Sequence, residues 1–340
     1  MFLHLKKESV IEPFKVNPML NTSHGTITSP LLDEVHGQDQ AKRALMIAAS
    51  GHHNLLLSGS HGSGKTMLAK VLVNLLPSLG EEEMVATTKL YSLAGENTDE
   101  IITSRPFRSP HHTASRISLI GGGSRPKPGE ISLAHLGVLF LDEILEYPRT
   151  SVESLRQPME DKKISVSRIE GHATYPADFM LVATMNPCPC GYYGDSIKEC
   201  SCTSNQILAY QKKLSGPLLD RIDLSINVVR VANNTILDHK SLVNLQHSNA
   251  QKQIEIATKI QIDRYGSSIK YNFSMTNSDI RKYAPLSDEA KIILSKASDR
   301  LGLSARSFLK VIKIARTIAD LSGEENIFSS HIGEALQYRN

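Results

Sequence analysis

Short apolar runs of strand length alternate with amphipathic, helix-like stretches through the first two thirds of the chain. Such runs lie within 54–58, 137–143 and 179–184, and polar residues follow each of them. Ahead of the first run, apolar positions recur at helical spacing from about 32 to 51. Continuous apolar strands are typical of parallel sheets that are buried on both faces. The pattern therefore predicts an α/β fold in which helices cover a parallel sheet.

The last third of the chain changes to helical periodicity after one more strand-like run at 224–231. A polar helical stretch is expected from about 235 to 264, and further helices near 277–283, 287–301, 304–321 and 329–338. The predicted organisation is a tail or linker remnant (1–30), an α/β core (31–232), a helical connector (233–270) and a C-terminal helical bundle (271–340).

A glycine-rich segment, GSHGSGKT, connects the first predicted strand to the helix that runs on to about 76. Its residues are Gly59, Ser60, His61, Gly62, Ser63, Gly64, Lys65 and Thr66. Glycines let the backbone turn tightly and bring its N–H groups close to phosphates at a helix N-terminus. Lys65 supplies a positive charge for the β- and γ-phosphates, and the Thr66 hydroxyl is suited to ligating Mg²⁺. The segment predicts a nucleoside triphosphate site.

Polar side chains follow the next two predicted strands. Asp142 and Glu143 end the run at 137–143, and Asn186 follows the run at 179–184. Carboxyl ends of parallel strands face the nucleotide, so we expect Asp142 to hold Mg²⁺ and Glu143 to polarise the attacking water. Asn186 is expected to reach that water and the γ-phosphate. The structural alternatives are an acidic surface turn and an Asn that caps the turn before Pro187.

Two arginines are candidates for stabilising the transition state. Arg221 precedes the strand at 224–231 and suits a finger that reaches a neighbouring subunit's γ-phosphate. An ion pair with Asp220 or Asp223 within the chain is the alternative. Arg306 lies in the first turn of a helix with Ser304 as its N-cap. It either swings with the helical bundle onto the phosphates or remains a solvated helix charge.

All cysteines of the chain lie in one segment, 187–203. They form two close pairs, which are Cys188 with Cys190 and Cys200 with Cys202. Four thiolates at this spacing either close a tetrahedral structural Zn²⁺ site or stay as free thiols in a reducing compartment. The clustering argues against a disulfide framework that spans the fold.

Composition and charge restrict the function further. The chain has 340 residues, 40% of them hydrophobic, and a formal net charge of +3. It lacks apolar runs long enough to span a membrane, and its N-terminus lacks the pattern of a signal peptide, so we expect a cytoplasmic protein without membrane partners. With so small a net charge, any nucleic-acid binding has to come from local basic loops.

The linked motifs resemble one family in particular, the magnesium-chelatase-like AAA+ ATPases of the ComM/YifB type. The resemblance covers about 32 to 338 and rests on Gly37-Gln38, GSHGSGKT, LFLDE, ATMNPCPCG, SGPLLDRIDL and LSARSFLKVIKIARTIADL. It implies an AAA+ αβα core with a C-terminal helical lid, ATP with Mg²⁺, and a hexameric ring with active sites between subunits. It also implies action on DNA, as a helicase in branch migration.

Two segments are candidates for the DNA contact that the resemblance implies. The segment 104–135 carries five basic residues and resembles the insert of related ring ATPases. These are Arg105, Arg108, Arg116, Arg125 and Lys127. The segment 162–176 alternates like a strand and turns near Gly171, as a hairpin would. Both suit contacts with backbone phosphates in a ring's pore, and subunit packing is the alternative.

The N-terminus departs from the family pattern. ComM-like proteins usually carry a Lon-protease-like domain ahead of the ATPase, and about thirty residues are too few to form one. We therefore expect either a truncated family member or a fragment. This leaves two other functions open, a chelatase-type ATPase subunit that remodels a protein partner, and a nucleotide-binding remnant without turnover.

Overall fold

A five-stranded parallel sheet lies at the centre of the computed structural model, which describes residues 30–96, 100–122, 126–168, 171–195, 197–231 and 245–339. Every pairing within this sheet is parallel, as predicted. In spatial order the strands are β2 (Phe107–Arg108), β5 (Val138–Leu141), β8 (Met180–Met185), β1 (Leu55–Ser58) and β9 (Leu224–Asn227). The expected tail at 1–30 lies almost entirely outside the described residues.

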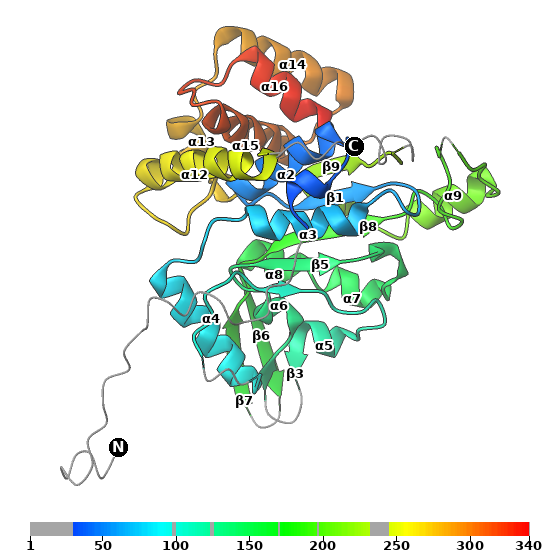
Figure 1. Cartoon of the computed structure of the whole chain (residues 1–340), viewed down its shortest axis with the longest axis vertical. Helices are drawn as coiled ribbons and strands as arrows, with labels where there is room; N and C mark the ends of the chain where they lie inside the picture. The colour runs from blue at the N-terminus through cyan, green and yellow to red at the C-terminus, as the bar shows by residue number, and fades with distance from the viewer. Residues whose placement is uncertain are drawn as a thin grey trace.

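Helices cover both faces of the sheet, which makes the core a three-layer αβα sandwich (Figure 1). Leu55 and Leu57 pack with α2, α3 and the C-terminal helices, whereas Leu56 packs with the helices of the opposite layer. This alternation follows from the two-residue period of a strand. The helices of the core are α2 (Asp39–Gly51), α3 (Lys65–Leu75), α4 (Glu81–Ala94), α5 (Arg116–Ile120), α6 (Glu130–Leu133), α7 (Arg149–Glu153), α8 (Arg156–Asp161), α9 (Ser204–Gln211) and α10 (Gly216–Leu219), with the 3-10 turns η1 (Leu32–Glu34) and η2 (Ile144–Glu146).

The helix expected from about 32 to 51 is broken in the structure. A 3-10 turn, η1, is followed by α2, which begins only at Asp39. Gly37 and Gln38 between them have left-handed φ angles of 60° and 59°, which an α-helix excludes. The C-cap is His52 (φ 55°), so the left-handed residue that ends α2 is not a glycine.

The C-terminal helices form a lid over the layer that holds α2 and α3 (Figure 1). They are α12 (Gln246–Tyr265), α13 (Asn277–Tyr283), α14 (Asp288–Leu301), α15 (Ala305–Leu321) and α16 (Ser329–Gln337), with the 3-10 turn η3 (Asn272–Ser274). Lys310 of α15 ties the lid to the sheet, because its ammonium donates to the Ile222 carbonyl at 2.8 Å and lies 3.4 Å from the Asp223 carboxylate. The helices predicted near 277–283, 287–301, 304–321 and 329–338 agree closely with α13, α14, α15 and α16. The first part of the predicted connector, 232–244, lies outside the described residues.

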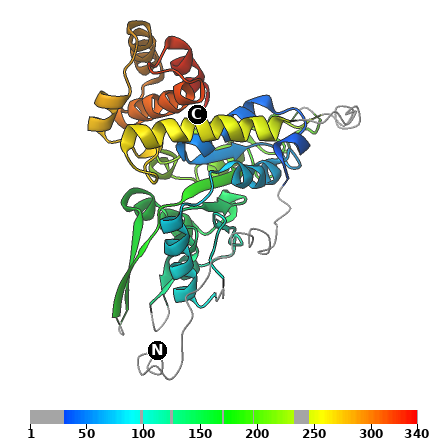
Figure 2. The ribbon, with the colours of Figure 1, turned by 60° about the vertical axis from the view of Figure 1, so that its left-hand side comes forward.

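A β-hairpin extends away from the lid at the far end of the core (Figure 2). Its strands are β6 (Lys163–Arg168) and β7 (Gly171–Pro176), which pair antiparallel from Lys163 opposite Pro176 to Arg168 opposite Gly171. A second short ribbon, β3 (Gly121–Gly122) with β4 (Lys127–Pro128), lies beside it. None of the helices in the described ranges has the length and apolar character needed to cross a membrane.

Candidate functional site

The glycine-rich segment lies at the carboxyl edge of the sheet, where β1 ends and α3 begins. Gly62 and Gly64 have φ angles of 75° and 90°, which side chains other than glycine rarely adopt. A Cβ added at Gly64 would meet nothing within 4 Å, so the backbone there faces open space. The loop is therefore a shallow backbone cradle at a helix N-terminus, which is a geometry suited to phosphate.

Lys65 is buried to 8% exposure within this cradle. Its ammonium donates to the carbonyls of Gly59 and Ser60 at 2.7 and 2.8 Å, and to the Asn186 side-chain oxygen at 3.3 Å. Burial lowers the pKa of Lys65 below its ordinary value, and the nearby carboxylates of Asp142 and Glu143 offset only part of that shift. The charge is thus held inside the site rather than in solvent.

The acidic pair meets the loop from the end of β5. The Thr66 hydroxyl lies 3.2 Å from an Asp142 carboxylate oxygen. The Thr184 hydroxyl of β8 donates to Asp142 at 2.6 Å and accepts the Glu143 amide at 2.8 Å. Thr184 was not predicted as a site residue, although a buried hydroxyl in an apolar strand was the signal that could have identified it.

Asn186 completes the group, because its amide lies 3.3 Å from a Glu143 carboxylate oxygen and its oxygen accepts from Lys65. The structure therefore brings together the predicted residues Lys65, Thr66, Asp142, Glu143 and Asn186, which come from the start of α3 and from the ends of β5 and β8. A hydroxyl and a carboxylate are hard oxygen ligands of the kind that Mg²⁺ prefers, so these residues fit a magnesium-bound triphosphate.

Arg221 lies at the opposite, amino edge of the sheet. Its carbonyl accepts from the Asn54 side chain at 3.0 Å, and Asn54 is the residue before β1. Its guanidinium pairs with Glu160 at 2.7 Å and donates to the Arg156 carbonyl at 3.1 Å. The predicted alternative was an ion pair with Asp220 or Asp223, whereas the partner in the structure is Glu160.

Arg306 lies beside Arg221. The Ser304 side chain accepts the Ser307 amide at 3.2 Å, which confirms the predicted N-cap of α15. The Arg306 guanidinium contacts the other carboxylate oxygen of Glu160. Hydrogen bonds from Arg221, opposed by burial and reinforced by Arg306, hold the pKa of Glu160 below its usual value. One carboxylate that the sequence did not single out therefore joins the two candidate arginines.

A groove of about 670 Å³ runs from Arg221 toward the base of the hairpin. Its walls come from α5, α7, α8 and β6, and they carry both charges. The charged residues are Arg116, Glu153, Arg156, Glu160, Asp161, Lys163 and Arg221.

The basic segment at 104–135 is less available than the sequence suggests. Arg105 is buried at 8% exposure and donates to the carbonyls of Pro77 and Leu136. Arg108 lies in β2 of the central sheet and pairs with Glu130 at 2.7 Å and Glu96 at 2.9 Å. Both residues are therefore structural, and the segment begins as a sheet strand rather than as a flexible insert. Arg125 lies outside the described residues.

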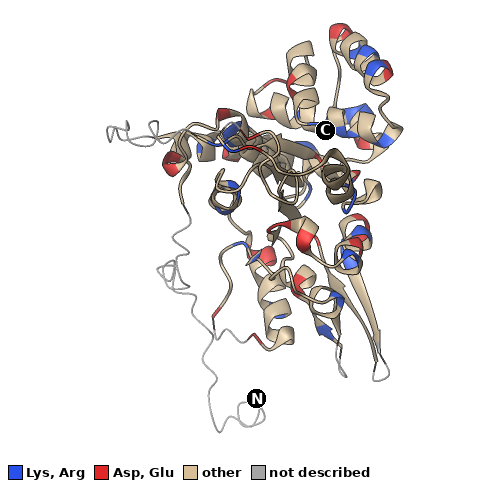
Figure 3. Cartoon of the chain, turned by 90° about the vertical axis from the view of Figure 1, so that its right-hand side faces the viewer, with Lys and Arg blue, Asp and Glu red and all other residues tan. Residues whose placement is uncertain are grey.

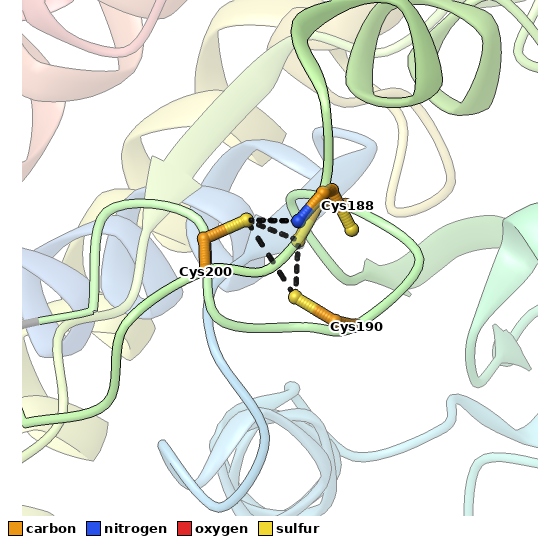
Figure 4. A group of neighbouring side chains, drawn as sticks. Cys188, Cys190 and Cys200 are labelled. Carbon is orange, nitrogen blue, oxygen red and sulfur yellow. Dashed lines mark hydrogen bonds between the residues drawn. The ribbon is translucent and has the colours of Figure 1, made fainter.

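The cysteine segment lies against the glycine-rich loop. The four sulfur atoms lie within 4.8 Å of one another, and Figure 4 shows three of the side chains converging. The ring of Tyr192, within the segment, meets the ring of His61 edge to face at 5.9 Å between centroids. A hydrogen bond from the Ser60 hydroxyl lowers the pKa of Asp195, in the same segment, to about 2. The sequence predicted the cluster but not its contact with the loop.

Taken together, the strand order, the glycine loop after β1 and the polar residues after β5 and β8 define an AAA+-type P-loop fold with a helical lid. The family model "Magnesium chelatase, subunit ChlI" matches residues 31–236, and that of the subunit's C-terminal part matches residues 245–339. The chain belongs to the ComM/YifB family of magnesium-chelatase-like proteins. That family is of the AAA+ ATPase type and implies use of ATP and Mg²⁺.

Relatives support the same assignment. Competence protein ComM of Haemophilus influenzae is 44% identical over 309 residues, which is 91% of this chain and 60% of that protein. The uncharacterized protein YifB of Escherichia coli is 42% identical over the same shares. The magnesium-chelatase 67 kDa subunit of Chlorobaculum parvum is 27% identical over 156 residues, covering 45% of this chain and 23% of the relative. The chain thus spans about 60% of the length of the ComM and YifB relatives.

Proposed function

We propose that the chain is an ATPase that works as a ring, hexameric by resemblance to its family, and hydrolyses ATP between subunits to act on DNA. One observation carries the proposal. The residues that fit a magnesium-bound triphosphate lie at one edge of the sheet, whereas Arg221 and Arg306 lie together at the other edge. An arginine at the amino edge is suited to a phosphate held by the next subunit, because a head-to-tail ring brings opposite faces together.

The chemistry of the proposed site follows from the contacts of the chain's own side chains. Lys65 neutralises charge on the β- and γ-phosphates, and Thr66 and Asp142 hold the metal. When bound, Mg²⁺ offsets the negative charge that develops on the phosphate oxygens. Glu143 orients the attacking water and receives its proton, while Asn186 holds the Glu143 carboxylate in place through its amide. Arg221 and Arg306 of the neighbouring subunit stabilise the transition state.

Action on DNA is supported by exposed basic residues at the hairpin end of the core. The hairpin projects from the body, and Lys163 at its base is exposed, as are Arg116 and Lys127 nearby. Elsewhere Lys and Arg are interspersed with Asp and Glu in the view of Figure 3, and the net charge is only +3. Contacts with DNA phosphates are therefore expected at the hairpin end, and binding should weaken steeply with added salt.

The test is steady-state ATP hydrolysis by the purified protein, with and without single-stranded and branched DNA, beside Glu143→Gln. DNA-stimulated hydrolysis that disappears in the variant supports the proposal. Hydrolysis that ignores DNA contradicts the DNA part and favours the second candidate, an ATPase that remodels a protein partner, to which the magnesium-chelatase family match points. ATP binding without any hydrolysis contradicts the proposal that the chain is an ATPase.

A further inference from the structure

The cysteine cluster has the dimensions of a metal site. The Cys188 sulfur lies 3.3 Å from that of Cys190 and 3.7 Å from that of Cys200, and the last two are 3.6 Å apart. Tetrahedral zinc with Zn–S bonds of about 2.3 Å separates its sulfur ligands by about 3.8 Å. A disulfide needs about 2.05 Å. The three separations are therefore close to those of ligands around one ion.

Backbone groups around the cluster also fit metal-bound thiolates. The Tyr193 amide donates to the Cys188 sulfur at 3.3 Å, and the Cys202 amide donates to the Cys200 sulfur at 3.4 Å. Such N–H···S bonds orient thiolate ligands and disperse part of their charge. Cys188 is buried, and Cys190, Cys200 and Cys202 are half-buried, so the cluster is partly shielded from solvent. A closed set of four sulfur ligands is typical of structural rather than catalytic zinc.

The segment that carries the cysteines packs directly against the glycine-rich loop. Gly191, with φ 81°, lies so close to His61 that an added Cβ would come within 2.0 Å of the imidazole ring. Tyr192 packs against the same ring. Arg230 bridges the two segments, because it donates to the His61 carbonyl at 2.6 Å and lies 3.9 Å from the Asp195 carboxylate. His61 is thus held by residues that stand between the two cysteine pairs.

We propose that the four cysteines bind one Zn²⁺ and that this ion fixes the segment 187–203 against His61, so that nucleotide affinity depends on the metal. The first half is independent of the proposed ATPase, and the second half rests on it. A segment of this length with little secondary structure has few contacts of its own to hold its shape. Four bonds to one ion would remove most of that freedom, while zinc binding releases thiol protons.

The metal site is tested by elemental analysis of the 340-residue chain purified under reducing conditions with zinc supplied. We expect one zinc per chain, and loss of it in Cys190→Ser/Cys200→Ser. Replacement by Co²⁺ should give the sulfur-to-cobalt charge-transfer bands and the visible spectrum of a tetrahedral thiolate site. Four titratable free thiols without metal, or disulfides with no cobalt spectrum, would overturn the metal site.

The coupling is tested by ATP titration of zinc-loaded and chelator-treated protein, with thermal unfolding recorded on both. Coupled sites typically differ by 5- to 150-fold in affinity, and we expect about tenfold weaker ATP binding without metal. Equal ATP affinity of the two folded forms would contradict the coupling. If the zinc-loaded protein does not bind ATP at all, the proposed function fails, while the zinc content still decides the metal site.

A pair of tyrosine variants keeps the coupling testable even if metal removal unfolds the chain. Tyr192→Ala removes the ring that packs on His61 and leaves all cysteines in place, so it should keep its zinc and bind ATP severalfold more weakly. Tyr193→Ala is the matched control, because Tyr193 is 54% exposed and its amide, which donates to Cys188, remains. ATP affinity of Tyr192→Ala equal to that of the control would overturn the coupling.

Discussion

The two edges of the central sheet differ in how their charged groups are satisfied. At the carboxyl edge, Lys65, Asp142, Glu143 and Asn186 contact one another within the chain. At the amino edge, Arg221 and Arg306 share the single carboxylate of Glu160. The first edge is a nearly complete site, whereas the second presents cations at the edge opposite the phosphate-binding loop. The proposed function accounts for the difference, because it divides the catalytic groups between two faces that meet only in an assembly.

The largest effect is expected at the carboxyl edge. Lys65→Ala should lose ATP binding and lower hydrolysis by more than about 10³-fold, because the buried Lys65 ammonium, held by the loop carbonyls of Gly59 and Ser60, supplies the charge for the phosphates. Nucleotide titration and steady-state hydrolysis measure both. Lys70→Ala, an exposed lysine of the same helix, should behave like the native protein. Full ATP binding by Lys65→Ala would contradict the assignment of the site.

Substitution of Arg221 at the amino edge should lower ATP hydrolysis without weakening ATP binding. Arg221→Ala is expected to lower hydrolysis on the order of 10³-fold while ATP affinity stays within about twofold, because in the proposed function the arginine acts only on the transition state of another subunit. The exposed Arg281 of α13 provides a control, Arg281→Ala. An equal loss of affinity and turnover would show that Arg221 serves its own chain's fold or site instead.

At the same edge, the contact between Lys310 of the lid and Asp223 should make the free energy of unfolding depend on pH. Burial alone raises the pKa of Asp223, but Lys310 and His53 hold it down at about 2. The stabilisation is then present above about pH 4, where the unfolded carboxyl is ionised, and is lost as pH falls toward 2. Asp223→Asn should cost roughly 2 kcal/mol of unfolding free energy at pH 7. The difference should shrink between pH 4 and pH 2 in denaturant titrations, and a difference that does not change with pH would refute the pairing.

The smallest effect is expected from Glu160. It is 41% exposed, and pairs of this kind contribute only about 0–1 kcal/mol. Glu160→Gln should therefore leave the fold intact and raise hydrolysis by at most severalfold, because both arginines become free to meet a neighbour's phosphate. Asp161→Asn is the control, since that carboxylate accepts from Gln157 instead. Strongly reduced hydrolysis in Glu160→Gln would mean that the pair positions the arginines rather than restrains them.

Local patterns predicted much of this molecule. The phosphate-binding loop, β5 with its acidic pair, and β8 with Asn186 all follow from residues that are close in sequence, where strand, turn and helix signals agree. The helices of the lid were predicted for the same reason. Because strands of one parallel sheet end at a common edge, the meeting of Lys65, Asp142 and Asn186 could also be predicted.

Contacts between distant segments could not be predicted. Arg105 looked like part of a basic loop, yet Pro77 and Leu136, about thirty residues away on either side, supply carbonyls that bury it. Glu160 gave no signal, because its two partners come from other elements and only the fold brings them together. The break before α2 was missed for a different reason, since Gln38 adopts a left-handed conformation that its residue type does not signal.

The division of the site between subunits is tested most directly by mixing two inactive variants. Lys65→Ala supplies a normal Arg221, and Arg221→Ala supplies a normal phosphate-binding loop. If the two edges meet between subunits, random mixing in a head-to-tail ring restores about a quarter of the interfaces, and ATP hydrolysis reappears. If each chain completes its own site, the mixture stays as inactive as either variant, which would contradict the division of the active site between subunits.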